Sequence, residues 1–339
     1  MAAYNAKSAA AAASSNAHRQ LANFFVRSRH HVSHLSNVRL EDVPALVPLP
    51  EQSTNDPRYY SQGSESWLRV RQGKLTAGKL AKVLGFLGPV AKARALNAMR
   101  ENQRDDDSSQ GREKSPTDGM LWGQLHERSA MLTYLTAYLL PRCPGARLLE
   151  TGFWPHDVTT SSLPLLSLGA SPDGLVEGAE PLVGPGGAIF EAKCPFPAGH
   201  NGAAGPRAHD HVPARMMPQL QGNLLATGRS VCHLMSWGPS YAIVHEVRAD
   251  SGYQQEMVGA CAAAIAAHAL GKGLTSAEML LADSIKLRSK ELAMQSTMLT
   301  RVAREQCVVA APSVEVLRAT YAAHPELART AHADADGDV

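Results

Sequence analysis

The fold of this chain is decided by Ser171-Pro172-Asp173-Gly174 and, shortly after it, Ile189-Phe190-Glu191-Ala192-Lys193-Cys194-Pro195. The first stretch has the residue types of a tight turn, with proline at its second position and Asp and Gly after it. The second is typical of a short strand. Since side chains two apart on a strand project from the same face, Glu191 and Lys193 are expected to lie side by side, with Asp173 arriving from the neighbouring turn.

Two carboxylates beside a lysine are the minimum equipment for metal-assisted hydrolysis of a phosphodiester. The carboxylates can hold a hard divalent cation such as Mg2+, and the lysine can orient or deprotonate a water. The same residues also fit a plain hairpin turn followed by a strand with an exposed salt bridge, because such turns are abundant. These residues alone leave both interpretations open.

Length and composition describe a globular chain with enough apolar material for a sizeable core. It has 339 residues, of which 44% are hydrophobic and 19% charged, enough for one large domain or two ordinary ones. No apolar run reaches about 18 residues, so we expect no membrane span. The net charge of +2 says little about partners. The scattered cysteines lack a CxxC spacing and indicate reduced thiols rather than disulfides or a zinc site (Cys143, Cys194, Cys232, Cys261 and Cys307).

Residues 1–40 differ in composition from the rest of the chain. They contain no Asp or Glu and carry basic residues in an Ala/Ser-rich background (Lys7, Arg19, Arg27, Arg29 and Arg39). This composition is typical of a mitochondrial or plastid transit peptide, and the alternative is a disordered basic tail on a protein that stays elsewhere inside the cell or nucleus, virus-encoded proteins included. Residues 41–62 are proline-rich and predict a linker, so 1–62 form a leader and linker.

A folded domain is predicted to begin near residue 63. Trp67–Arg71 predicts a short helix that Gly73 ends, and Thr76 is expected to cap a second helix running to about Leu84. Residues 66–100 contain eight basic residues and no acidic one. Because counter-charges are absent, we expect this segment to contact a polyanion rather than to form an ordinary solvated face.

The remaining pattern alternates strands and helices. Residues 101–118, including Asp105–Asp107, predict a solvated polar insertion rather than a metal site, and residues 119–140 predict a long helix. A helix is expected over 214–227, the region from Tyr253 to Leu327 is almost wholly helical in pattern, and the acidic tail is 331–339. Strands are predicted at 147–154, 164–169, 187–193, 231–237 and 242–248.

This order predicts an α/β fold with a central mixed β-sheet flanked by helices and a helical C-terminal region. The expected units are the leader and linker, a core over 63–250, a helical extension over 251–330 and the tail. His209 and His211 lie in an irregular stretch and are interpreted as surface residues, not metal ligands. His126, beside Glu127 in the long helix, is the better candidate for supporting a site.

Five motifs in order resemble the YqaJ-like viral recombinase family, which includes phage lambda exonuclease and belongs to the PD-(D/E)xK restriction-endonuclease-like nucleases. The resemblance covers roughly residues 64–248. The motifs are Trp67-Leu68-x-x-Arg71-x-Gly73-x-Leu75-Thr76-Ala77, Trp122-Gly123-x-x-x-x-Glu127, Leu168-Gly169-Ala170-Ser171-Pro172-Asp173-Gly174, Glu191-Ala192-Lys193-Cys194-Pro195 and Pro218-Gln219-Leu220-Gln221.

The resemblance implies a restriction-endonuclease-like core and a role for each matching residue. Asp173 and Glu191 would be the metal-binding carboxylates, joined by the backbone carbonyl of Ala192. Lys193 would position the attacking water and stabilise the transition state. Glu127 corresponds to the helical acid of the metal site. The implied cofactor is Mg2+, with Mn2+ as a substitute.

Further positions follow from the same resemblance. Gln219 or Gln221 corresponds to the polar helical residue near the catalytic lysine. Arg71 corresponds to the arginine that contacts the DNA phosphate near the strand end, with Thr76 as a further phosphate contact. The family usually has serine where this chain has Gly78. That departure puts strict dependence on a 5′-phosphate in doubt.

The implied function is a metal-dependent DNA exonuclease that trims duplex ends in recombination or repair. A PD-(D/E)xK endonuclease and a catalytically silent DNA-binding accessory protein are the alternatives, and intact Asp173, Glu191, Lys193 and Glu127 argue against the silent one. The expected partner is duplex DNA ends. A homo-oligomer and a single-strand annealing protein are further candidate partners, and a membrane is not expected.

Overall fold

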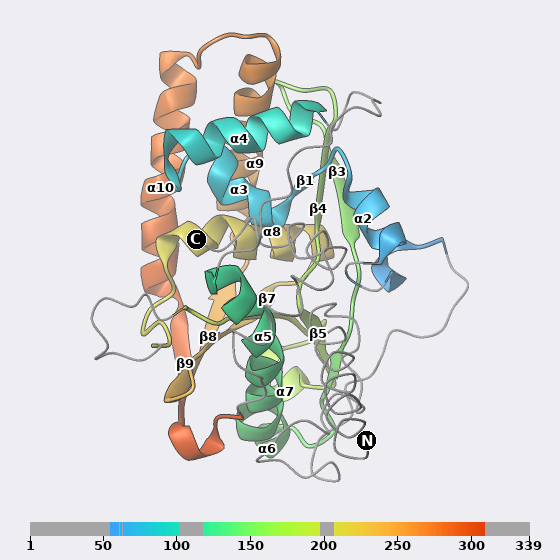
Figure 1. The fold of residues 1–339 in the computed structure, drawn as a ribbon, viewed down its shortest axis with the longest axis vertical. Helices are drawn as coiled ribbons and strands as arrows, with labels where there is room; N and C mark the ends of the chain where they lie inside the picture. The colour runs from blue at the N-terminus through green and yellow to red at the C-terminus, as the bar shows by residue number, and fades with distance from the viewer. Residues whose placement is uncertain (1–54, 61, 63, 102–117, 197–206, 309–339) are drawn as a thin grey trace, which may run out of the picture.

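The computed structural model describes residues 55–60, 62, 64–101, 118–196 and 207–308 (Figure 1). The expected transit-like leader and most of the linker lie outside the described residues. So do nearly all of the polar insertion, including its three consecutive acids, and the chain beyond residue 308 with its acidic tail.

The centre of the fold is a six-stranded mixed sheet in the order β2-β5-β6-β7-β8-β9. β6 and β7 are parallel, and the other neighbours are antiparallel. The mixed α/β class expected from the sequence is confirmed. The strands are β2 (Arg147–Leu149), β5 (Gly174–Glu177), β6 (Ala188–Lys193), β7 (Val231–Trp237), β8 (Tyr241–Arg248) and β9 (Thr297–Ala303).

A smaller sheet in the order β1-β4-β3 stands beside the first. Its strands are β1 (Leu75–Thr76), β3 (Trp154–Val158) and β4 (Leu166–Ala170). The turn Ser171–Asp173 joins β4 of the small sheet to β5 of the large one. This turn is therefore the point where the chain passes from one sheet to the other.

Helices cover both faces of the large sheet (Figure 1). On one face α8 packs against β6 and β7, with α3, α9 and α10 packed on α8; on the other face α5 packs against the same two strands. Each face has its own cluster of buried apolar side chains. The helices are η3 (Pro57–Tyr59), α2 (Glu65–Arg71), α3 (Ala77–Val83), α4 (Gly88–Glu101), α5 (Asp118–Thr133), the π-helix η4 (Tyr134–Leu139), α6 (Leu140–Arg142), α7 (Glu180–Val183), η5 (Ala214–Met216), α8 (Met217–Thr227), α9 (Ser251–Ala269), α10 (Ser276–Gln295) and η6 (Arg304–Gln306).

The close approach of α8 to α3 depends on a glycine. A Cβ atom at Gly222 would lie 2.5 Å from Cδ1 of Leu80 and 3.1 Å from Cβ of Ala77. Distances this short leave no room for a side chain, because core packing is already near its limit. Gly222 therefore lets α8 lie where its polar side chains reach the large sheet.

The structure corrects several sequence-based expectations. Residues 297–303 were expected to be helical and instead form β9, which pairs with β8 as the outer strand of the sheet, so strand pairing overrides local propensity there. The predicted strand 147–154 is two strands, β2 and β3, in different sheets, and β5 was not predicted. Thr76 occupies the N-cap position of α3, but its hydroxyl makes no capping hydrogen bond.

None of the described helices combines the length and apolarity that crossing a membrane requires.

Candidate active site

Asp173 is fixed at the junction of the two sheets. The backbone N–H of Ala192 donates a hydrogen bond to Oδ2 of Asp173 at 2.7 Å. Nε2 of Gln62 donates to the carbonyls of Pro172 and Thr151, both at 2.9 Å, which anchors the turn from its other side. The turn and β6 are thereby brought together, as the sequence pattern predicts.

Glu191 and Lys193 form a buried ion pair on β6. Their side chains project from the same face, as expected from their spacing, and Nζ of Lys193 lies 3.2 Å from Oε1 of Glu191. Glu191 is 2% exposed and Lys193 is 8% exposed. Burying two charges carries a desolvation cost that a single ion pair seldom recovers, so a site of this kind is rarely retained for stability. The alternative of an exposed salt bridge on a plain hairpin is wrong.

Two amide side chains on α8 hold the Glu191 carboxylate. Nε2 of Gln219 donates to Oε1 at 2.7 Å, and Nδ2 of Asn223 donates to Oε2 at 2.9 Å. Residues four apart share one face of a helix, which is why both amides reach the same carboxylate. Asn223 was missed in the sequence, although its four-residue spacing from Gln219, on a helix with Pro218 in its first turn, could have indicated it.

Gln221 does not join this constellation. It lies two residues from Gln219 and so points away from the sheet face that carries Glu191. Its Nε2 donates to the carbonyl of Arg248 at 2.7 Å, and its Oε1 accepts from the N–H of Asp250 at 3.0 Å. The structure thus separates the two candidates: Gln219 contacts the carboxylate, and Gln221 ties α8 to the β8–α9 connection.

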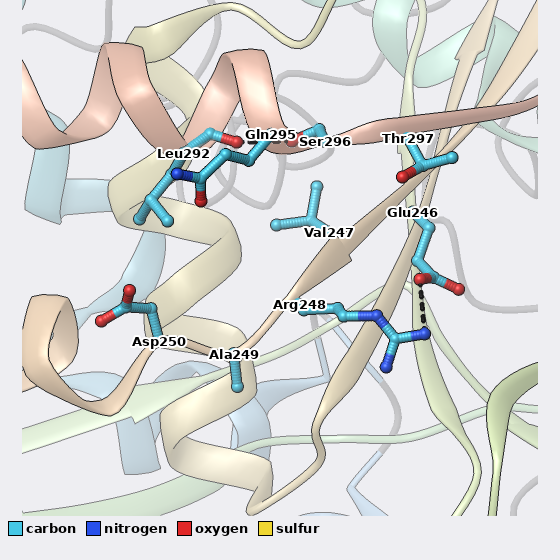
Figure 2. A pocket seen from close by; sticks show the side chains of 9 residues that line it. All are labelled: Glu246, Val247, Arg248, Ala249, Asp250, Leu292, Gln295, Ser296 and Thr297. Carbon is cyan, nitrogen blue, oxygen red and sulfur yellow. Dashed lines mark hydrogen bonds and ion pairs between the residues drawn. The ribbon is translucent and has the colours of Figure 1, made fainter.

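The connection that Gln221 anchors also borders a cavity of about 180 Å³ between the end of β8 and the α10–β9 junction (Figure 2). Two of its lining residues, Arg248 and Glu246, form an ion pair with 2.8 Å between Nη2 and Oε1. The charged groups of this pair compensate each other. None of Asp173, Glu191 and Lys193 lines the cavity, so it is separate from the constellation on β6.

Glu127 lies on α5, on the opposite face of the sheet from the Glu191 side chain. Its neighbour His126 is buried, stacks on Trp237 with ring centroids 4.6 Å apart, and has a pKa lowered to about 4 by burial. In the described part of the chain, no three or more His, Cys, Asp or Glu side chains are grouped to share one metal ion. The structure therefore does not cluster Glu127 with Asp173 and Glu191, and its metal role stays a prediction.

The two histidines before α8 differ from each other. His211 is exposed, as expected. His209 is only partly exposed: its N–H donates to Oγ of Ser236 at 2.7 Å, and its carbonyl lies 3.0 Å from Nε2 of His245. Ser236 pairs with Lys193 across β6 and β7, so this segment covers the sheet beside the lysine.

Arg71 is linked to the Asp173 turn through a buried tryptophan. The guanidinium carbon of Arg71 lies 3.6 Å from the ring centroid of Trp67, which is a cation–π distance. The indole N–H of Trp67 donates to Oγ of Ser171 at 3.0 Å, two residues before Asp173. Thr76, by contrast, is 5% exposed, which places the second expected phosphate contact below the surface.

Residues 66–230 match the family model described as the YqaJ-like viral recombinase domain. This segment of the chain is similar to that domain. The matched region holds every site residue placed above, from Arg71 to Asn223, and confirms the resemblance seen in the sequence motifs.

Solved structures and curated proteins were also compared with the chain. Two crystal structures of LHK-Exo, an alkaline exonuclease from Laribacter hongkongensis, one of them in complex with dAMP, are 18% identical to it with a TM-score of 0.40. The alignments cover 68% of this chain and 100% of each LHK-Exo chain. No curated protein matches the chain.

The oxygen atoms of this constellation fit a hard divalent cation. Asp173 and Glu191 are carboxylates, and the carbonyl of Ala192 lies between Glu191 and Lys193 on the same strand. Mg2+ prefers oxygen ligands and is commonly held by one or two carboxylates, with waters and substrate phosphates in its other positions. Two carboxylates suffice for that mode, so the absence of a larger ligand group among the described residues does not argue against it.

The link between Trp67 and Ser171 generates a stability prediction. Trp67→Phe removes the indole N–H and keeps an aromatic ring beneath Arg71, and Ser171→Ala removes the acceptor. In a double-mutant cycle measured by urea unfolding, we expect a coupling free energy of about 1 kcal/mol, the usual net value of one hydrogen bond. A coupling near zero would show that the contact does not tie α2 to the turn.

Proposed function

We propose that this chain is a divalent-metal-dependent DNA exonuclease that hydrolyses phosphodiester bonds at duplex ends in recombination or repair. The observation that carries the proposal is the buried Glu191–Lys193 pair, with Gln219 and Asn223 on the carboxylate and Asp173 beside Ala192. The match to a YqaJ-like viral recombinase domain over residues 66–230 supports DNA as the substrate. We propose Mg2+ as the metal, with Mn2+ able to replace it.

The protein's own residues would divide the chemistry between them. Gln219 and Asn223 fix the orientation of the Glu191 carboxylate, so that its position does not change as charge develops on the substrate. Lys193 donates hydrogen bonds to the attacking water and to the charged phosphate. A bound divalent cation would stabilise the negative charge on the phosphate and favour ionisation of water.

Contacts with DNA would come from the basic segment before the long helix. Arg71 lies on α2 and is held against Trp67, which is hydrogen-bonded to the turn that carries Asp173. A planar guanidinium suits bidentate contact with a phosphate. Arg69 on the same helix is already paired with Glu65 at 2.6 Å, so the two arginines are not equivalent.

A homo-oligomer and a single-strand annealing partner stay predictions.

The first functional prediction concerns Lys193→Met and Glu191→Gln. Each variant should lower the rate of degradation of linear duplex DNA in Mg2+ by about 10²–10³-fold, the cost of losing one preorganised electrostatic group. Lys272→Met, at an exposed site beyond α9, is the matched control and should keep the wild-type rate. Full wild-type activity in excess EDTA would contradict the metal requirement. Degradation of circular duplex DNA would favour an endonuclease, and degradation of neither would favour a silent DNA-binding protein.

The second functional prediction compares the two arginines of α2. Arg71→Ala should weaken DNA binding and lower the slope of log K against log salt by about 0.9, the contribution of one phosphate contact to duplex DNA. Arg69→Ala removes the same charge two residues away and should change the slope much less, because Arg69 is paired with Glu65. Equal slopes for the two variants would mean that Arg71 makes no specific phosphate contact.

The third functional prediction restores the serine that the family usually has. A Cβ at Gly78 would meet no atom within 4 Å, so Gly78→Ser fits without displacing a neighbour. We expect this variant to increase the rate ratio for 5′-phosphorylated over 5′-hydroxyl duplexes, because a hydroxyl would add a donor for the phosphate. Gly259→Ser on α9, where a Cβ also meets nothing within 4 Å, is the control. A strong preference for 5′-phosphate in the wild type would contradict the inference drawn from Gly78.

A further inference from the structure

Four aromatic rings form a row on the α5 face of the large sheet. Trp237 on β7 stacks on His126 with centroids 4.6 Å apart, His126 lies 4.0 Å from Trp122, and Trp122 meets Phe196 edge-on at 6.1 Å. Trp237 is fully buried, whereas Phe196 is 40% exposed. The row therefore runs from the core to the surface, and Phe196 is its outer member.

Phe196 follows the catalytic strand closely in the chain. Its side chain lies on the α5 side of the sheet because side chains alternate between the two faces after Glu191. Ala192 and Cys194 pack against the apolar cluster on the α5 face, and Phe196 continues that side through its contact with Trp122. Lys193 is three residues before Phe196, and three extended residues span at most about 10 Å. The exposed ring therefore lies within one or two nucleotides of the phosphate that Lys193 would contact.

The members of the row contact one another through their ring faces and edges. His126 lies between Trp122 and Trp237 and packs as an aromatic ring. An exposed aromatic ring suits a nucleobase, which offers a flat π-face for stacking, better than it suits a phosphate.

We propose that Phe196 is a stacking platform for an unpaired base next to the scissile phosphate. The inference rests on the proposed nuclease function and extends it: Phe196 would be a positioning residue that accepts one unstacked base from the end of the duplex. Stacking of this kind tolerates any base, because every base has a π-face. Trp122 contacts Phe196 edge-on and connects it, through His126, to the buried ring of Trp237.

The test compares two duplexes that differ in one base. One carries a single unpaired adenine at its end, and the other carries an abasic residue at the same position. Binding is measured by fluorescence anisotropy in Ca2+ without Mg2+, to limit cleavage. The wild type should prefer the unpaired adenine, and Phe196→Ala should weaken binding to that duplex by about 5- to 150-fold, the range found for loss of one stacked base, while binding to the abasic duplex changes little.

Conservative variants and a distant control make the result specific. Phe196→Trp should retain the preference for the unpaired adenine, and Phe196→Leu, which keeps apolar volume without a π-face, should behave like Phe196→Ala. Leu270→Ala is the control, because this residue is 67% exposed at the C-cap of α9. Thermal unfolding of each variant checks that the fold persists.

The outcomes separate the inference from the proposed function. Equal loss on both duplexes in Phe196→Ala, or wild-type preference retained in Phe196→Leu, overturns base stacking. A wild type that degrades linear DNA in Mg2+ but binds the two duplexes equally overturns only the stacking platform. A wild type that neither binds nor degrades DNA overturns the proposed function and the platform with it.

Discussion

The buried carboxylate of Glu191 is the constraint on which the rest of the structure depends. A charged group with 2% exposure must be compensated by donors, or it would be neutralised or expelled. The donors come from two elements, Lys193 on the same strand and Gln219 and Asn223 on α8. α8 must therefore lie at a fixed height and rotation over β6. Gly222 permits its contact with α3, and Gln221 ties its other side to the β8–α9 connection.

A second constraint is that the turn carrying Asp173 must join two different sheets. The turn that carries it leaves β4 of the small sheet and enters β5 of the large one. A turn between two sheets has no strand-to-strand hydrogen bonds of its own. Side chains hold it instead: Nε2 of Gln62 donates a hydrogen bond to the Pro172 carbonyl, and the indole N–H of Trp67 donates one to Oγ of Ser171. Because Trp67 also lies beneath Arg71, the same contacts that fix the acid fix the arginine.

Local features of the site could be predicted from the sequence, and long-range ones could not. The two-residue spacing of Glu191 and Lys193 requires a shared face on any strand, and the residue types of Ser-Pro-Asp-Gly predict a turn. The approach of that turn to Glu191 comes from the pairing of β5 with β6, in which Gly174 lies opposite Phe190. Which of Gln219 and Gln221 contacts Glu191 depends on the rotation of α8 about its axis. Packing against α3 sets that rotation. Trp67 and Ser171 are 104 residues apart, and only the folded chain brings them together. The prediction of a helix where β9 lies was wrong for a related reason, because the extended conformation of β9 comes from its pairing with β8.

The two faces of β6 carry different chemistry, and this limits how a nucleic acid strand can lie. Glu191 and Lys193 face α8, where the side chains of Gln219 and Asn223 donate hydrogen bonds to the carboxylate. Ala192 and Cys194 face α5, where the neighbours are apolar or aromatic and where Glu127 and the ring row lie. A strand whose phosphate meets Lys193 at the end of β6 would have its backbone against the polar face, and a base turned away from that backbone would meet the aromatic one. In the proposed nuclease, the alternation of a single strand would thus separate the phosphate from the base contact over a distance of one or two nucleotides.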